Sequence, residues 1–184
     1  AWATIDREEA LTTAKQLEEE ASQGKSRGLL HGVPVGLKAI FYTAGMKTAA
    51  GSKVYADFVP DFDATSVAKI KEAGGIILGK AVTTEFAQSD PSPTFDPWNP
   101  EHTPGGSSSG SGAATAAYLC ATSLGEDTGG SIRFPATRCG LVGIRPSWGL
   151  VSRYGVMRGV WSMDTVGPIP RTGEDLAPIH LSKP

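Results

Sequence analysis

The sequence predicts an α/β fold with a mixed β-sheet core flanked by α-helices. Residues 33–41 and 76–78 are short apolar runs typical of buried strands. Between them, a helix is predicted from a cap at Asp63 to about Ala73, where two glycines would end it. This order of strand, helix and strand favours a layered arrangement in which at least some strands are parallel.

The first part of the chain and the segment before the Gly-rich region give two further elements. Asp6 can cap a helix that carries an apolar stripe and ends near Gly24. Residues 88–106 are rich in proline and are predicted to form an ordered loop, because Phe95 and Trp98 offer apolar surface for burial.

The Gly-rich region predicts three short elements in succession. Residues 113–121 are rich in alanine and favour a helix. A short strand is predicted near Leu124, and a glycine-rich turn then leads into a helix that begins at about Ser131. Glycines that cluster between apolar runs in this way indicate tight turns around a site.

Composition and charge exclude several classes of function. The chain has 17 Lys and Arg against 19 Asp and Glu, a net charge of −2, so nucleic acid and anionic membranes are poor partners. No apolar stretch approaches the roughly 18 residues of a membrane span. Cys120 and Cys139 cannot form a disulfide framework, and they fit a reduced, cytoplasmic setting.

Lys38 interrupts an otherwise apolar strand. Burial disfavours the charged ammonium form of lysine, and a neutral lysine can act as a general base. The alternative is a lysine that extends its charged end to water or pairs with a carboxylate. The strand alone does not decide between the two.

Two segments combine serine with glycine. The first, PGGSSSGSG at residues 104–112, can be read as a turn that feeds a helix cap. The second, GEDTGGSIR at residues 125–133, can present consecutive backbone amides to an anion or an oxyanion. A purely structural or phosphate-binding turn is the alternative, but the Gly-Lys-Ser/Thr ending of a Walker motif is missing.

Taken together and in order, these segments resemble the amidase-signature family. The resemblance covers nearly the whole chain and includes several separated motifs. These motifs are GVPVGLK at 32–38, TTEFA at 83–87, PGGSSSGSG at 104–112, DTGGSIR at 127–133, CGLVG at 139–143 and SRYG at 152–155.

The resemblance implies a Ser–cisSer–Lys catalytic triad. By position, Ser131 is the nucleophile, Ser107 the bridging serine and Lys38 the terminal base. The three side chains are expected to form a hydrogen-bonded chain from Lys38 through Ser107 to Ser131. The separation of Ser131 from Ser107 is the one that the family pattern expects, which rules out Ser108 as the bridging residue. In the family the peptide before the bridging serine is cis, here the bond from Gly106 to Ser107.

The resemblance also assigns the residues around the nucleophile. Asp127 and Arg133 match positions that support the catalytic turn, as Gly106 supports Ser107. The family's oxyanion hole maps onto the backbone amides of Thr128, Gly129, Gly130 and Ser131.

The resemblance implies hydrolysis of a carboxamide C–N bond through a serine acyl-enzyme, with a small-molecule amide as substrate. It implies no metal or organic cofactor, and a homodimer is left open as the assembly. His31, His102 and His180 match no family role and are expected in loops. Residues 1–184 are expected to be one catalytic domain that is incomplete at both ends, since family members run to several hundred residues.

Two positions depart from the family pattern. Ala39 stands where an acidic residue usually follows the lysine. The absence of that carboxylate is expected to weaken activity. Glu126 occupies a position often held by threonine, in a part of the motif that varies.

Four other functions compete with a free-standing amidase. The glutaminase subunit of a tRNA-dependent amidotransferase resembles the sequence in the same motifs and would pass ammonia to a partner. A non-catalytic scaffold on the same fold is favoured only by Ala39 and the short chain. A nitrilase-like site with Lys38 and Cys120 is disfavoured, because that cysteine lies in an Ala-rich helical stretch. The G-x-S-x-G pattern at 106–110 is rejected as a nucleophile elbow, because the segment before it is Pro-rich and not a strand.

Overall fold

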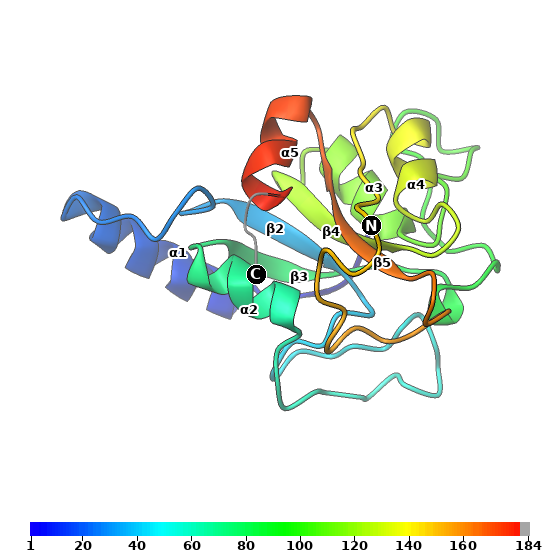
Figure 1. The fold of residues 1–184 in the computed structure, drawn as a ribbon, viewed down its shortest axis with the longest axis horizontal. Coiled ribbons are helices and arrows are strands. Elements are labelled where there is room, and N and C mark those ends of the chain that lie inside the picture. Colours follow the sequence, from blue (N-terminus) through cyan, green and yellow to red (C-terminus); the bar gives the residue numbers. More distant parts are fainter. Residues whose placement is uncertain (181–184) are drawn as a thin grey trace.

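The computed structural model describes the backbone of residues 1–180 and the side chains of residues 1–176. Strands and helices alternate over most of this length, and long loops connect several of them (Figure 1). In chain order the elements are β1 (Trp2–Ile5), α1 (Arg7–Ser22), β2 (Pro34–Lys38), α2 (Thr65–Glu72), β3 (Ile76–Ala81), the 3₁₀ helix η1 (Glu85–Ala87), α3 (Ser109–Ala116), β4 (Thr122–Asp127), α4 (Arg133–Arg138), β5 (Thr165–Pro170) and α5 (Gly173–His180).

The strands form one mixed sheet in the order β1-β3-β2-β4-β5. The three inner strands are parallel: β2 pairs with β3 on one side and with β4 on the other. The outer strands β1 and β5 run antiparallel to their neighbours. The predicted α/β class and the partly parallel sheet are therefore confirmed.

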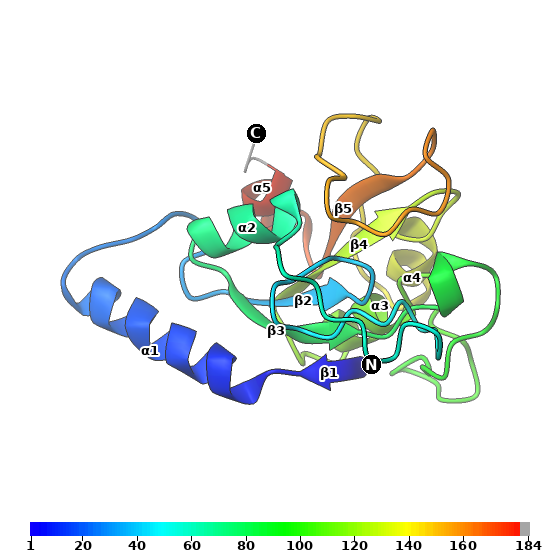
Figure 2. The same ribbon diagram turned by 90° about the horizontal axis from the view of Figure 1, so that it is seen from below.

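Side-chain alternation along β3 places helices on both faces of the sheet. Ile77 belongs to the main core cluster, which includes Val67 and Ile70 of α2. Its neighbour Ile76 instead joins Leu17 of α1 in a second cluster. Figure 2 shows α1 and α2 on opposite sides of the sheet. Both faces of the central strands are thus buried, as parallel strands require.

Helix α3 lies close against the sheet because its first turn is made of small residues. A Cβ atom added to Gly110 would lie 2.3 Å from the backbone nitrogen of Val82, which follows β3. One added to Gly112 would lie 2.8 Å from Pro135 Cβ in α4. Every residue of α3 is buried. The glycines of the Gly/Ser segment therefore serve close packing, which brings the preceding Ser107 to the end of the sheet.

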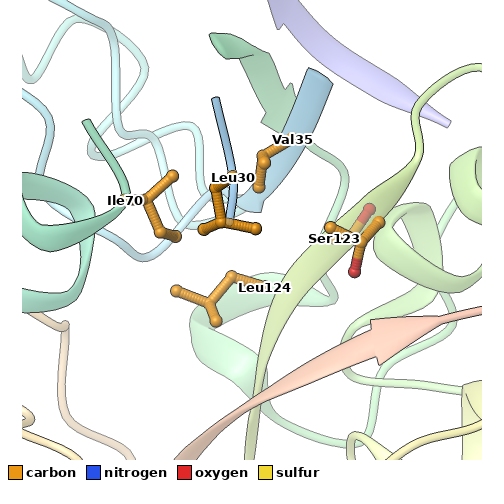
Figure 3. A pocket seen from close by; sticks show the side chains of 6 residues that line it. Leu30, Val35, Ile70, Ser123 and Leu124 are labelled. Carbon is orange, nitrogen blue, oxygen red and sulfur yellow. The ribbon is translucent and has the colours of Figure 1, made fainter. Parts of the chain in front are cut away.

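A narrow crevice lies between α2 and the inner strands (Figure 3). Ile70 of α2 and Leu30 face Val35 of β2 and Leu124 of β4 across it, with Ser123 at its edge. It has no room for a water molecule. It is a packing gap in the core.

Several predicted boundaries are wrong, for identifiable reasons. Strand β2 ends at Lys38 and not at residue 41, because the Lys38 carbonyl accepts the amides of Ile40 and Phe41 in a turn. Helix α3 begins at Ser109 and ends at Ala116, earlier than the predicted 113–121, because Gly110 and Gly112 are needed for packing and do not break it.

The predicted cap at Asp63 is also wrong. Helix α2 is capped at Ala64, and the Asp63 carboxylate instead accepts the amide of Ala44 at 2.9 Å and pairs with Lys71 at 2.7 Å. The expected burial of Phe95 and Trp98 is wrong as well, since each is 65% exposed. The indole of Trp98 nevertheless donates to the carbonyl of Cys139 at 2.8 Å, which anchors the Pro-rich loop.

The sequence pattern missed both edge strands and the last helix. Strand β5 contains Pro168 and Pro170, and proline is tolerated on an edge strand because one side of it needs no ladder hydrogen bond. His180 closes α5, so its expected place in a loop is wrong. His31 and His102 lie in turns and loops, as predicted.

Lys80 is a second lysine buried in the sheet. Its ammonium group donates to Thr43 Oγ1 at 2.7 Å and to the carbonyl of Phe41, so it holds the turn that follows β2. Burial lowers the pKa of Lys80 to about 7, while Asp63 opposes and Lys71 assists this shift. Lys80 thus has a structural role in this turn, and its pKa lies well below the usual lysine value.

We predict that Lys80 makes stability rise with pH above neutrality. Between the folded value of about 7 and the ordinary lysine value of 10.5, the unfolded chain binds one more proton than the folded chain, so raising the pH favours folding. Relative to Lys80→Met, the wild-type free energy of unfolding should increase by at most about 1.4 kcal/mol per pH unit. Urea unfolding of both proteins at several pH values measures this, and a pH-independent difference contradicts it.

Candidate active site

Lys38 lies where the carboxyl ends of β2 and β4 meet. Leu37 pairs with Leu124 in the parallel ladder, so the last residues of both strands reach the same end of the sheet. The Lys38 side chain is fully buried there. Burial lowers its pKa, an effect that Glu126 opposes as the nearest anion. The environment favours a lysine that can lose its proton.

The segment before α3 brings Ser107 to this lysine. Lys38 Nζ and Ser107 Oγ are 2.7 Å apart, a hydrogen bond between two buried groups from distant parts of the chain. The peptide bond from Gly106 to Ser107 is cis. The predicted contact between Lys38 and Ser107 and the predicted cis bond are both confirmed.

Ser131 opens onto the same cavity as Ser107. The cavity has a volume of about 610 Å³, and both serines line it together with Thr128 and Gly129. Ser131 is half-buried, and within residues 1–176 its hydroxyl makes no hydrogen bond, so the expected link to Ser107 Oγ is not formed in this structure. Lys38 does not line the cavity and lies behind Ser107. Ser107 therefore separates Lys38 from the cavity.

The turn before Ser131 presents free backbone amides. The amide of Gly130 is used internally, since it donates to Asp127 Oδ1 at 2.7 Å. The amides of Thr128, Gly129 and Ser131 have no acceptor within the described part of the chain. Three of the four amides predicted for an oxyanion hole are thus free to donate to a ligand, whereas Gly130 is committed to the turn.

Asp127 holds this turn from the inside. Its buried carboxylate accepts the amides of Gly130, Ile132 and Arg133. It also pairs with the guanidinium of Arg133 at 3.0 Å and lies 3.5 Å from that of Arg145. Burial opposes its ionisation, but the hydrogen bonds from Arg133 and Ile132 outweigh burial and lower the pKa of Asp127. Asp127 and Arg133 thus hold the turn before Ser131 together, and the catalytic support predicted for them stays a prediction.

Glu126 contacts the buried lysine directly. Its Oε2 lies 3.0 Å from Lys38 Nζ, and its side chain is almost fully buried. Thr128 Oγ1 lies 2.8 Å from Glu126 Oε1 and 2.6 Å from Asp164 Oδ1. A continuous chain of polar contacts thus runs from Ser107 through Lys38, Glu126 and Thr128 to Asp164.

Sequence reasoning missed Glu126, Asp164 and Arg145 as members of the site. In the sequence Glu126 is visible only as a variable position of the motif, although a carboxylate one residue from a buried strand end is an available signal. Asp164 and Arg145 lie outside the motif, and no spacing connects them to it. Among residues 1–176, no group of three His, Cys, Asp or Glu side chains is arranged to hold a metal ion.

Comparisons with known proteins agree on one family. The family model described as Amidase matches residues 1–181. A candidate amidase of Mycobacterium tuberculosis, AmiD, is 48% identical over 181 residues, which are 96% of this chain and 38% of that protein. A glutamyl-tRNA(Gln) amidotransferase subunit of Geobacter metallireducens is 49% identical over 183 residues, with the same two coverages of 96% and 38%.

The comparison of structures agrees with the comparison of sequences. The solved peptide amidase of Stenotrophomonas maltophilia aligns with a TM-score of 0.94 and 37% sequence identity, over 100% of this chain and 39% of its own. The chain spans about 38% of the length of the curated relatives that it matches. A family match over 181 residues and relatives at this level of identity show that the chain belongs to the amidase-signature family.

Proposed function

We propose that this chain carries the catalytic centre of an amidase that hydrolyses a carboxamide C–N bond through a serine acyl-enzyme. The observation that carries the proposal is the buried 2.7 Å contact between Lys38 Nζ and Ser107 Oγ, placed behind a cavity that Ser131 also lines. A shielded lysine that contacts a serine hydroxyl is the arrangement that a proton relay to a nucleophile needs.

The proposed first step forms the acyl-enzyme. Ser131 Oγ attacks the amide carbonyl, its proton passes to Ser107 Oγ, and the proton of Ser107 passes to neutral Lys38. Ser131 has to rotate toward Ser107 for this, and catalytic hydrogen bonds frequently tighten only when substrate is bound. The half-buried position of Ser131 leaves its hydroxyl free to do so.

The free amides before Ser131 suit the developing oxyanion. We propose that Thr128, Gly129 and Ser131 donate to it, while Gly130 shapes the turn through its bond to Asp127. The proton on Lys38 then returns through Ser107 to the leaving amine, and the C–N bond breaks. Water attacks the acyl-enzyme by the same relay and releases the carboxylic acid and Ser131.

A second candidate function is the glutaminase reaction of a tRNA-dependent amidotransferase. The 49% identity to one component of such an enzyme favours it, and the same site would release ammonia from glutamine. Strict dependence on glutamine and a co-purifying partner protein would identify this function. Hydrolysis of simple amides by the isolated protein would identify the free-standing amidase.

We place the reaction in the cytoplasm as part of the proposal. Cys120 and Cys139 are both free and buried, which fits a reducing compartment. No helix within residues 1–180 has the length and apolar character to cross a membrane. A homodimer remains a prediction, which the molecular mass in solution would test. That residues 1–184 form a single domain also remains a prediction.

We predict that mutation of the relay removes serine reactivity in a non-additive way. Ser131→Ala should abolish labelling by a fluorophosphonate probe, because the attacking oxygen is gone. Lys38→Ala and Ser107→Ala should each slow labelling by about a thousandfold, about 4 kcal/mol of barrier, and the double variant by little more. The protein is best expressed from its complete reading frame, with Ser109→Ala as the matched control. Multiplicative losses would show that Lys38 and Ser107 do not act as one relay.

We predict that the labelling rate rises with pH and levels off below the ordinary lysine pKa of 10.5. Only neutral Lys38 can accept a proton, and burial lowers its pKa, with Glu126 opposing. The measurement is the labelling rate of wild type and of Lys38→Ala across pH. A rate that falls with rising pH, or a Lys38→Ala variant with the same rise, contradicts the role of Lys38.

We predict that a methyl group is tolerated at Gly129 but not at Gly130. Gly130 has φ of +138°, and a Cβ there would lie 2.4 Å from the Phe134 ring, whereas a Cβ at Gly129 has open space around it. Gly130→Ala should therefore lower the free energy of unfolding by about 1–3 kcal/mol, and Gly129→Ala by much less. Thermal or urea unfolding compares the two, and equal losses would contradict the described geometry of the turn.

A further inference from the structure

We propose that Lys38 and Glu126 share one proton, and that Thr128 and Asp164 hold this proton on Glu126 while the enzyme rests. Glu126 is then a neutral acid that positions a neutral Lys38. This inference rests on the proposed function, because it explains how the base stays free to accept a proton. It assigns a positioning role to a carboxylate that the family pattern does not place here.

The Thr128 hydroxyl lies between the carboxyl groups of Glu126 and Asp164. It is 2.8 Å from Glu126 Oε1 and 2.6 Å from Asp164 Oδ1, and a hydroxyl has one hydrogen. Thr128 can donate to only one of these carboxyl groups. The other contact is a hydrogen bond of its own only if the second carboxyl group is protonated and donates to Thr128 Oγ1.

The surroundings of Asp164 decide which carboxyl group is ionised. Asp164 Oδ1 accepts the amide of Val160 at 2.8 Å, and Oδ2 accepts the amide of Gly159 at 2.8 Å. Both oxygens therefore act as acceptors of backbone donors, as an ionised carboxylate does. Thr128 donates to Asp164, and the proton lies on Glu126 Oε1.

The contacts of Lys38 fit the same count. A neutral amine has two hydrogens and one lone pair, and Lys38 Nζ has three polar contacts. Glu126 Oε2 at 3.0 Å and the Glu126 carbonyl at 3.4 Å accept its two hydrogens. If Lys38 is neutral, the Ser107 hydroxyl at 2.7 Å donates to its lone pair, which is the direction in which the proposed relay runs.

The remaining charge near this pair is already compensated. Asp127 is the other anion that acts on Lys38 at the end of β4, and its carboxylate is turned toward Arg133 and Arg145. Asp164, from the segment before β5, is held by two backbone amides and Thr128. An ion pair is therefore the competing state, in which the proton has left Glu126 Oε1 and lies on Lys38 Nζ, 3.0 Å from Glu126 Oε2.

Two variants separate these states through the pH dependence of fluorophosphonate labelling. Glu126→Gln keeps a donor toward Thr128 and an acceptor toward Lys38, so we expect the pH of half-maximal rate to stay within roughly 0.3 unit. Thr128→Val removes the hydroxyl, so the proton moves to Lys38. The rise in rate should then shift to higher pH by about one unit, because the ammonium must lose its proton beside a carboxylate. Thr115→Val, a buried threonine outside the site, should leave the midpoint unchanged.

A second measurement needs neither substrate nor probe. The wild-type infrared spectrum at neutral pH should contain the C=O stretching band of a protonated carboxylic acid, and Glu126→Gln should lack it. An absent band, a band that persists in Glu126→Gln, or a Glu126→Gln midpoint lowered by about one unit would overturn the inference, since each indicates an ionised Glu126. Failure of Ser131 labelling in a protein that shows the band would instead remove the proposed function.

Discussion

The burial of Lys38 at the end of the sheet is the constraint on which the site depends. A lysine at this depth is stable only if it is neutral or lies next to an anion. Lys38 contacts Ser107 on one side and Glu126 on the other. The position exists because β2 turns immediately after Lys38, so the side chain meets the end of β4 instead of continuing along a strand. The parallel pairing of β2 and β4 then brings the two motifs together.

Close packing places the second group of residues around that lysine. Ser107 reaches it because the glycines of α3 let this helix approach the chain at the end of β3. The turn before Ser131 keeps its shape because the Asp127 carboxylate accepts three backbone amides and pairs with two guanidinium groups. These two sets of contacts have different effects on the site. The first fixes where the bridging serine lies, and the second fixes which backbone amides remain free to donate.

The fold class and the contact of Lys38 with Ser107 could be predicted from the sequence, because the motifs that indicate them are short and local. The Gly/Ser segments and the apolar run around Lys38 are contiguous, and their order alone indicates the family. Strands β1 and β5 could not be predicted in this way, since β1 is only four residues long and β5 contains two prolines. Their pairing depends on inner strands that are distant in sequence. Asp164 joins the site for the same reason, because only the folded segment before β5 brings it to Thr128.

The two departures from the family pattern have different consequences in the folded chain. Ala39 is buried in the turn after β2, where its amide bonds to Ala81 and its carbonyl accepts from Ala50, so the backbone uses the position and a methyl group fills it. Glu126 instead introduces a buried carboxyl group beside Lys38. An unpaired carboxylate at this depth would be costly, and Lys38 and Thr128 together satisfy both of its oxygens. Thr128 also contacts Asp164 at 2.6 Å, so the variable position and the segment before β5 have to be considered as one unit.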